Sequence, residues 1–219
     1  EGTANEQGAV PMYFNRFAAF LALATLAASP ALAVGASGEA TGSRRMVEHQ
    51  YTSPPVGYVQ FCRTNVADCR ESGRGERPGD LTASAWRDLV EVNAQVNAQV
   101  SPITDQELFG IAEYWTYPAN QGDCEDYVLL KRKKLIERGW APNSVLITVV
   151  RDRAGDGHAV LTVVTTAGDL VLDNQDPEIR YWNETPYRYL KRQSRTDATK
   201  WASLQDDRRF DDMPVAATR

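Results

Sequence analysis

The sequence predicts an α+β domain in which helices come first and an antiparallel sheet follows. Between residues 82 and 139, apolar residues recur at three- and four-residue steps, which is the period of amphipathic helices. From 145 to 174, runs of β-branched residues alternate with Gly- and Asp-containing turns, a pattern typical of an antiparallel meander. No internal repeat interrupts this order. Helices followed by strands therefore indicate a single α+β domain.

Length and charge are those of an ordinary globular protein. The chain has 219 residues, 42% of them hydrophobic, and a formal net charge of −5. Its lysines and arginines are scattered and form no stripe that would attract a phosphate backbone, so nucleic acid is not expected as a partner. The basic run at 131–134 falls on a predicted helix, and we interpret it as a solvated face.

Residues 1–33 carry the pattern of an upstream segment followed by a signal peptide. Met12 and Arg16 make a short basic start, 17–28 are apolar, and Ala31-Leu32-Ala33 resembles a cleavage site. The apolar stretch is shorter than the roughly 20 residues that a membrane-spanning helix needs, so no transmembrane anchor is expected after cleavage. The sequence therefore predicts an exported, periplasmic protein.

Mobile segments are expected on either side of the domain. Residues 34–54 begin with a stretch rich in Gly, Ala, Ser and Thr and are interpreted as a mobile leader. Residues 206–219 are interpreted as a flexible tail. The folded domain is predicted to occupy residues 55–205.

The spacing of the three cysteines separates a pair from a single thiol. Cys62 and Cys69 lie close together, whereas Cys124 stands alone. In an exported protein this favours a local disulfide between Cys62 and Cys69 and a free thiol at Cys124. A metal site at the pair lacks further ligands, because His49 and His158 are both distant in sequence.

The first long helix is predicted to begin at Thr82 or Ser84, either of which can cap it. Asn93 and Asn97 fall on or beside its apolar face and are interpreted as hydrogen-bonded structural residues. A shorter helix is expected within 105–115. The apolar face of the long helix is predicted to bury Trp86, Leu89, Val90, Val96 and Val100.

A second long helix is predicted to begin at Cys124. Asp123 would cap it, Asp126 would complete a variant of the capping box, and Gly139 would follow its C-terminus. Helix amides and the macrodipole favour an anion at this position, which would lower the pKa of the thiol. The neighbouring acids, Glu125 among them, act in the opposite direction, so a thiolate there needs an imidazolium or a cation beside it.

His158 is the only candidate base within the predicted domain. It opens a strand after the turn at 154–157, and Asp173 on the neighbouring strand could bind its second ring nitrogen. Cysteine, histidine and aspartate together form the triad of nucleophilic catalysis, so we interpret Cys124, His158 and Asp173 as nucleophile, base and orienting group. The amide of Cys124 and a donor from 115–121 would form an oxyanion hole.

The hairpin register bears on this triad. A two-residue turn at 167–168 would pair Asp173 with Thr162, four residues from His158 and about 13 Å away at strand spacing. We therefore expect a longer loop or a β-bulge, which would bring Asp173 opposite His158 or its neighbours.

Three segments, in this order, resemble the bacterial transglutaminase-like cysteine proteinases. They are GDCEDY at 122–127, GHAVL at 157–161 and LDN at 172–174. The similarity extends over roughly 55–201 and also takes in Phe61-Cys62 with Cys69, Val92-Asn93, Val96-Asn97, Tyr114-Trp115 and residues 187–194. The resemblance implies a papain-like or transglutaminase-like fold, the triad Cys124, His158 and Asp173, and residence in the periplasm.

The resemblance also implies a substrate, a partner and a metal ion. Proteinases of this kind cleave large cell-surface adhesins, release cells from a biofilm, and are controlled by a receptor in the inner membrane. They depend on calcium held by carboxylates beside the nucleophile, which correspond here to Asp123, Glu125 and Asp126. No organic cofactor is implied. A second interpretation stays open, with Asp123 and Asp126 as caps and Glu125 in solvent.

Three functions follow from these residues. The favoured one is a periplasmic cysteine endopeptidase that forms a thioester acyl-enzyme. The second is an acyltransferase of transglutaminase type, in which an amine in place of water resolves the thioester. The third is a non-catalytic, calcium-responsive binding protein. The triad by itself does not separate the first from the second.

Overall fold

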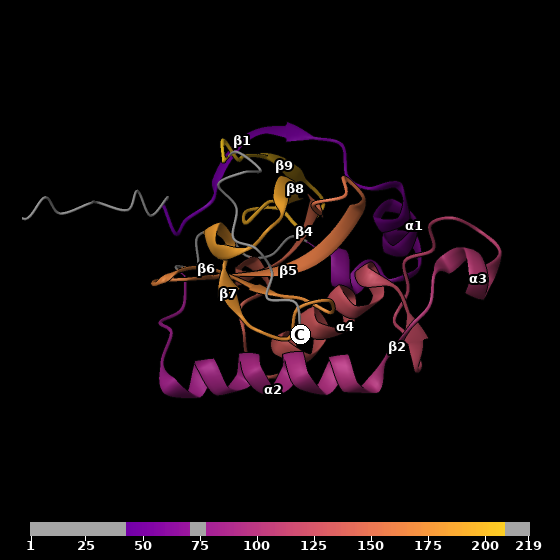
Figure 1. Ribbon diagram of the computed structural model, residues 1–219, viewed down its shortest axis with the longest axis horizontal. Helices are drawn as coiled ribbons and strands as arrows, with labels where there is room; N and C mark the ends of the chain where they lie inside the picture. The colour runs from indigo at the N-terminus through magenta and orange to yellow at the C-terminus, as the bar shows by residue number, and fades with distance from the viewer. Residues whose placement is uncertain (1–42, 71–77, 209–219) are drawn as a thin grey trace, which may run out of the picture. The chain divides into compact units, whose positions relative to one another are not determined.

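In the computed structural model, the structure describes residues 43–70 and 78–208, drawn in colour in Figure 1. All described residues belong to a single compact unit of the chain. The predicted signal peptide at 1–33 therefore lies outside the described residues, as do residues 209–219 of the predicted tail. In the described part, no helix combines the length and the apolar character needed to cross a bilayer.

Seven antiparallel strands form the main sheet in the order β1-β9-β8-β4-β5-β6-β7. The predicted meander is its β4-β5-β6 part, and the prediction of an antiparallel sheet after helices is confirmed. The strands are β1 (Val47–Thr52), β4 (Val145–Arg151), β5 (Gly157–Thr165), β6 (Gly168–Leu172), β7 (Arg180–Tyr181), β8 (Arg188–Gln193) and β9 (Trp201–Gln205). Two further short strands, β2 (Ser101–Pro102) and β3 (Gln121–Gly122), pair in parallel.

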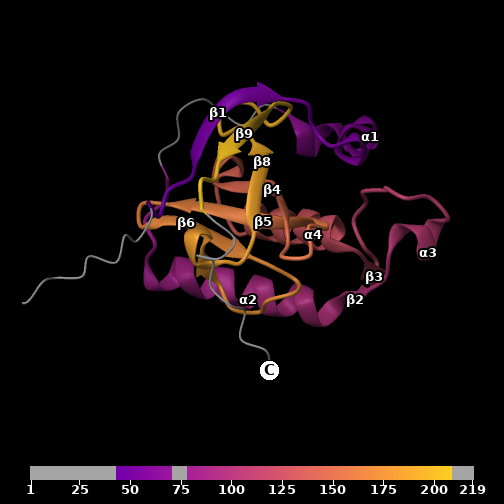
Figure 2. The same cartoon turned by 45° about the horizontal axis from the view of Figure 1, so that its top comes forward.

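Helices cover one face of this sheet. The central helix α4 packs on β4 and β5, and α2 packs on α4 from the far side (Figures 1 and 2). The helices are α1 (Val56–Thr64), α2 (Ala83–Gln99), α3 (Asp105–Phe109) and α4 (Cys124–Glu137), with 3-10 turns at Val66–Cys69, Pro142–Ser144 and Trp182–Glu184. The N-terminus of α4 thus meets the beginning of β5.

Helix α2 begins where the sequence predicts, and three of the five apolar residues predicted to be buried are buried: Leu89, Val96 and Val100. The side chain of its N-cap, Thr82, accepts a hydrogen bond from the amide of Ala85. Leu89 and Val96 are buried as predicted, together with Val92. Trp86 and Val90 are 39% and 43% exposed, so their predicted burial is wrong. The buried stripe is the one that contacts α4, and the apolar residues beside it face away from the core.

The basic run on α4 is only partly a solvated face. Lys131 and Arg132 are 0% and 6% exposed, which contradicts the predicted role of the first half of the run. Arg132 donates to the carbonyl of Val145, while the Lys131 ammonium lies 5.9 Å from the ring centroid of Tyr127. Burial lowers the pKa of Lys131 to about 7. Both residues are enclosed because α4 is covered by the sheet on one side and by α2 on the other.

The described domain extends beyond residues 55–205 at both ends. Within the predicted leader at 34–54, residues 47–52 form β1, which supplies the backbone partners for β9. In the predicted tail at 206–219, the Asp206 carboxylate accepts from the amide of Tyr189 and pairs with Arg208. Residues 47–52 and Asp206 thus satisfy polar groups along the sheet.

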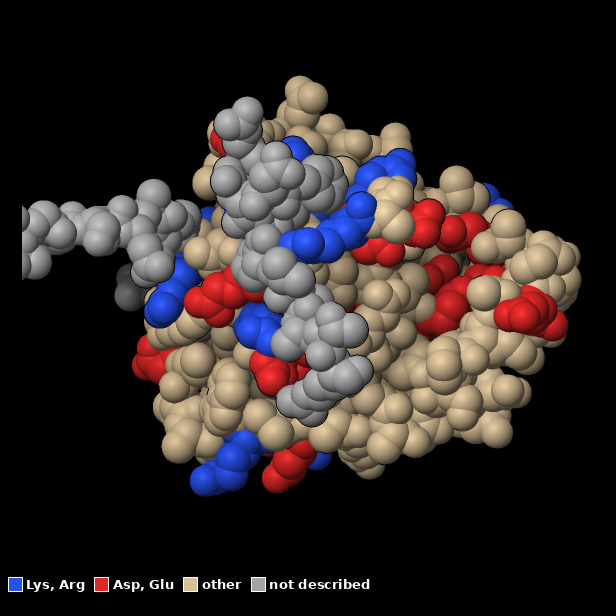
Figure 3. All heavy atoms as spheres, in the orientation of Figure 1, with Lys and Arg blue, Asp and Glu red and all other residues tan. Residues whose placement is uncertain are grey.

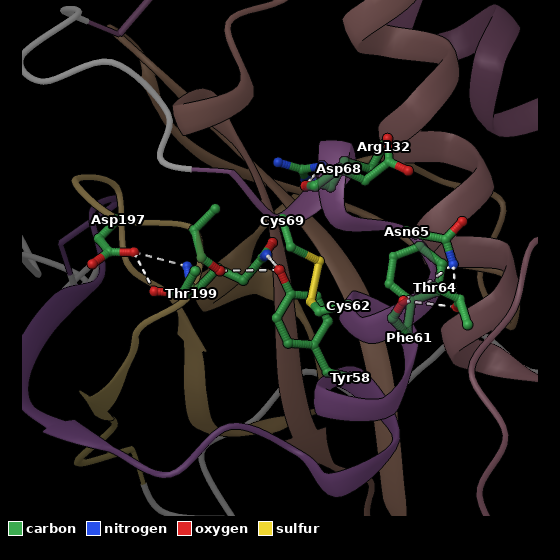
Figure 4. Close-up of a disulfide and its surroundings, with 12 residues drawn as sticks. Tyr58, Phe61, Cys62, Thr64, Asn65, Asp68, Cys69, Arg132, Asp197 and Thr199 are labelled. Carbon is green, nitrogen blue, oxygen red and sulfur yellow. Dashed lines mark hydrogen bonds between the residues drawn. A yellow bond between two sulfur atoms is a disulfide. The ribbon is translucent and has the colours of Figure 1, made fainter.

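A disulfide joins Cys62 of α1 to Cys69 of the following 3-10 turn, as predicted, with the two Cα atoms 5.7 Å apart. Figure 4 shows it beside Tyr58, whose hydroxyl donates to the carbonyl of Ala198 at 3.0 Å. Cys69 is buried in the main core cluster, whereas Cys124 is the free cysteine. The bridge therefore fastens α1 to the body of the domain.

The β5-β6 hairpin needs neither the predicted loop nor the predicted bulge. Its two-residue turn is at 166–167, one residue earlier than predicted, and the ladder is regular up to the pair of Leu161 with Leu172. The next residue is Asp173, which lies two ladder positions from His158. Diagonal neighbours at that spacing come within reach of each other's side chains.

Candidate active site

The free cysteine and the histidine line a common cavity. Cys124 is the first residue of α4, and His158 is the second residue of β5. Together they border a cavity of about 390 Å³ whose walls also include Trp115, Val149 and Ala159. The sequence places them here because a helix start and a strand start meet at the same edge of the domain.

His158 and Asp173 form a buried hydrogen-bonded pair. Nε2 of His158 lies 2.8 Å from Oδ1 of Asp173, and the two residues are 4% and 2% exposed. Since the carboxylate can only accept while it is ionised, Nε2 carries the proton and Nδ1 is the basic nitrogen. The side-chain amide of Gln175 lies 3.4 Å from Nδ1. The triad members His158 and Asp173 are thus brought together.

The Asp173 carboxylate is held in its ionised form. Burial by itself raises its pKa, but the hydrogen bond and charge of His158 and further hydrogen bonds from Tyr187 and the Gln175 amide hold the pKa below its usual value. Asn97 donates to the backbone carbonyl of Asp173 at 2.8 Å, in agreement with its predicted structural role. Tyr187 and Gln175 were not among the predicted site residues, because no local sequence pattern links them to Asp173.

The thiol of Cys124 is protonated in this arrangement. Sγ donates to Oε2 of Glu125 at 3.0 Å, and among the described residues no hydrogen bond joins it to His158. Burial raises the pKa of Cys124 well above its usual value, and the charge of Glu125 and the hydrogen bond to it raise it further. Of the two opposing effects expected at this position, the adjacent acid, together with desolvation, outweighs the helix amides.

Three aspartates form a cluster at the start of α4, which we call the acidic cluster: Asp105, Asp123 and Asp126. One carboxylate oxygen from each lies within 4.8 Å of the others. Figure 3 shows acidic side chains gathered over the part of the surface where Figure 1 labels α3. The residues expected to hold a metal ion were Asp123, Glu125 and Asp126. The cluster keeps two of these and adds Asp105, whereas Glu125 binds the thiol.

Each member of the acidic cluster has one oxygen held and one oxygen without a partner. Backbone amides donate to the held oxygens: Tyr114 to Asp105, Asp105 to Asp123 at 3.3 Å, and Thr116 to Asp126 at 2.9 Å. The second oxygens, Oδ1 of Asp105, Oδ1 of Asp123 and Oδ2 of Asp126, are buried and accept no hydrogen bond. Uncompensated buried acceptors are costly, so the cluster has the donor set and the need for a hard cation.

Burial raises the pKa of every carboxyl in the acidic cluster and that of Glu125, and repulsion from neighbouring acids adds to it for Asp123, Glu125 and Asp126. The pKa of Asp126 is raised to about 7 and that of Glu125 to about 8, in both cases chiefly through burial. Asp105 and Asp123 shift in the same direction. Metal-free, the cluster therefore tends to hold protons near neutral pH.

The predicted capping box at the start of α4 is absent. The side chain of Asp123 makes no capping hydrogen bond, and Asp126 accepts from the amide of Thr116 instead. Both carboxylates are turned toward Asp105, which lies 18 residues before Asp123 and gives no local sequence signal. The second interpretation of the acids, as caps with Glu125 in solvent, is accordingly not what the structure contains.

Two donors within 115–121 are already engaged, so they do not complete the predicted oxyanion hole. The indole N–H of Trp115 donates to Glu113 at 3.1 Å, and the amide of Thr116 donates to Asp126. The amide of Cys124 belongs to the first turn of α4, where backbone N–H groups have no partner within the helix. It stays the candidate donor for an oxyanion.

Comparison with known proteins gives a family and several similar structures. Residues 48–209 match the family described as bacterial transglutaminase-like cysteine proteinase. Calcium-bound LapG of Legionella pneumophila is 25% identical over 49% of this chain and 64% of that chain, with a TM-score of 0.44. EGTA-treated LapG is 23% identical over 56% of this chain and 72% of that chain, with a TM-score of 0.46. No curated protein sequence matches the chain.

The matched segment contains the whole of the site described above. It includes the helix start at Cys124, the strand start at His158 and the acidic cluster. The chain spans just under two thirds of the length of calcium-bound LapG. The resemblance noted in the sequence is confirmed by a family match that covers most of the chain, and the protein belongs to the bacterial transglutaminase-like cysteine proteinases, a family of cysteine peptidases.

Proposed function

We propose that this protein is a cysteine endopeptidase in which Cys124 is the nucleophile, His158 the general base and Asp173 the orienting group. One observation carries the proposal. Asp173 binds Nε2 of His158 in a buried pair, so that Nδ1 is the basic nitrogen, and His158 lines the same cavity as the free cysteine. In a cysteine peptidase, one ring nitrogen of the histidine is bound by the orienting group, and the other accepts the proton of the thiol.

The proposed reaction begins when the thiol turns from Glu125 to Nδ1 of His158 and transfers its proton there. The sulfur then attacks a peptide carbonyl carbon, and the amide of Cys124 donates to the developing oxyanion. The imidazolium returns the proton to the leaving amine as the C–N bond breaks, which leaves a thioester. Water, deprotonated by the same nitrogen, hydrolyses the thioester and regenerates the thiol.

Space on both sides of the nucleophile supports cleavage within a chain. Cys124, Gly157 and His158 border the cavity of about 390 Å³ and also a second one of about 320 Å³. The first continues toward α1 and Trp115, and the second continues toward β2 and Asn174. An extended peptide that crosses the nucleophile would have room before and after the scissile bond, as an endopeptidase requires.

The test compares Cys124→Ala and His158→Ala with the unaltered protein on a protein substrate. Removing either member of such a unit typically lowers turnover by about 10⁴-fold or more. Circular dichroism checks that each variant keeps the fold, because Cys124→Ala removes only a sulfur atom whereas His158→Ala leaves the buried Asp173 without its partner. An active Cys124→Ala variant would refute the triad. Added amines that become joined to the substrate would instead identify an acyltransferase, and a Cys124 inert to thiol reagents would favour a binding protein.

We further propose that the acidic cluster holds calcium. Its three unpartnered carboxylate oxygens are the hard ligands that Ca²⁺ prefers, and they are buried and already oriented by backbone amides. A bound divalent cation would offset the acids beside the thiol and so favour the thiolate. Asp105, Asp123 and Asp126 would hold it.

Titration calorimetry with calcium tests this site directly. We expect Asp105→Asn to lose most of the binding that the unaltered protein shows. Glu107→Gln is the matched control, because Glu107 lies on the same helix, binds Thr104 and does not belong to the acidic cluster. Equal binding by both variants would refute the assignment.

Substrate, partner and compartment are proposed from the resemblance in sequence. We propose a periplasmic enzyme that processes a large surface adhesin, contributes to release from a biofilm, and is restrained by a receptor in the inner membrane. The pattern at 17–33 supports export. Incubation with adhesin fragments, followed by N-terminal sequencing of the products, tests the substrate, and intact fragments would contradict it.

A further inference from the structure

Tyr187 contacts both supporting members of the triad. It lies just before β8, is 6% exposed, and donates its hydroxyl to Oδ2 of Asp173. Its ring centroid is 5.4 Å from that of His158, with the two planes inclined at 51°. A single side chain thus binds the carboxylate and packs beside the imidazole that the carboxylate orients.

Among the described groups, only the Tyr187 hydroxyl donates a hydrogen bond to Oδ2 of Asp173. Oδ1 accepts from Nε2 of His158 and from the amide of Gln175, whereas Oδ2 accepts from Tyr187. Lys131 attracts the carboxylate electrostatically, but its ammonium makes no hydrogen bond within the described residues. Without the tyrosine hydroxyl, Oδ2 would be a charged, buried oxygen with no donor.

The backbone that carries Tyr187 is fastened independently of the triad. Arg208 donates to the carbonyl of Tyr187, to that of Thr185 at 3.1 Å and to that of Trp182 at 3.2 Å. The proximity of the Asp173 charge and burial raise the pKa of Tyr187 far above its usual value, with burial the larger cause, so its hydroxyl stays a donor. The contact to Asp173 is therefore built into the fold.

We infer that Tyr187 is a positioning residue of the active site. By binding Oδ2 it keeps Asp173 ionised and fixes the plane of the carboxylate, so that Oδ1 faces Nε2 of His158. The imidazole then keeps its proton on Nε2 and presents Nδ1 to the thiol. This role rests on the proposed function, since it acts only through the pair that the proposal calls base and orienting group.

The experiment compares Tyr187→Phe with Tyr189→Phe in the full chain. Tyr189 is a matched control, because it is 2% exposed and its hydroxyl is hydrogen-bonded at 2.9 Å to Thr185, away from the triad. Each variant loses one buried hydroxyl and keeps its ring. We expect Tyr187→Phe to lower kcat about 10- to 100-fold with little change in KM, and Tyr189→Phe to leave both near their original values.

A second measurement separates this inference from the proposed function. The Nε2 proton of His158 is observed by proton NMR in the resting protein, where no substrate or turnover is needed. We expect its resonance to shift in Tyr187→Phe, to be unchanged in Tyr189→Phe, and to be insensitive to Tyr187→Phe once Asp173→Asn is present. An unchanged resonance in Tyr187→Phe, or equal effects of the two phenylalanine substitutions, would overturn the inference even if the protein is a peptidase.

Discussion

Asp126 should make the stability of the metal-free protein decrease as pH rises. Its side chain is buried, with the residue 0% exposed, and burial together with the nearby acids raises its pKa from 3.8 to about 7. Between these two values the folded state binds a proton that the unfolded chain has released, so the free energy of unfolding falls with increasing pH. A difference of about 3 pH units, at about 1.36 kcal/mol each, corresponds to about 4 kcal/mol, fully lost above about pH 7.

Urea unfolding between about pH 4 and about pH 8 in the presence of a chelator measures this effect. We expect Asp126→Asn to reduce the fall seen in the unaltered protein, because the amide does not titrate. Calcium should reduce the fall as well, since a ligand that binds only the folded state offsets the ionised carboxylate. Glu107→Gln should leave the pH dependence of the free energy of unfolding as it is in the unaltered protein. The reasoning is refuted if Asp126→Asn leaves the pH dependence unchanged.

Two further predictions concern the disulfide and the glycine beside the acidic cluster. Replacing Cys62 and Cys69 by serine should lower the free energy of unfolding by about 2–3 kcal/mol, the value expected for closing so short a loop. Urea unfolding without reductant measures this change. An unchanged free energy of unfolding would contradict the anchoring of α1 by the disulfide. Gly122→Ala places a Cβ 2.4 Å from Oδ2 of Asp126, so it should weaken the calcium binding measured by calorimetry. Gly79→Ala is the control, because no atom lies within 4 Å of its new Cβ, and it should leave calcium binding unchanged. Equal affinities would contradict the geometry of the cluster.

Local signals identified several elements and the residues proposed to react. The cap at Thr82 marked the start of α2, and the spacing of Cys62 and Cys69 indicated their disulfide. The helix start placed Cys124, and the strand start placed His158. These features depend on residues within a few positions of one another, so the sequence contains all the information that they need.

The electrostatic state of the thiol was beyond local reasoning. The helix start and the neighbouring acids act on the pKa of Cys124 in opposite directions, and burial together with the Glu125 carboxylate raises it. The charge of Lys131 was likewise assigned to solvent, although the residue is 0% exposed. Desolvation depends on which elements cover a group, and that is a property of packing.

The sequence by itself thus determined an α+β domain, a paired and a free cysteine, and one histidine and one aspartate as candidates for the triad. The tertiary structure alone decided that Asp105 joins Asp123 and Asp126, and that Tyr187 binds Asp173. These contacts join residues that are 14 or more positions apart and lie on different elements. Periodicity and capping act over one or two turns, whereas such contacts arise only when the helix start, the loop before it and the sheet edge are packed together.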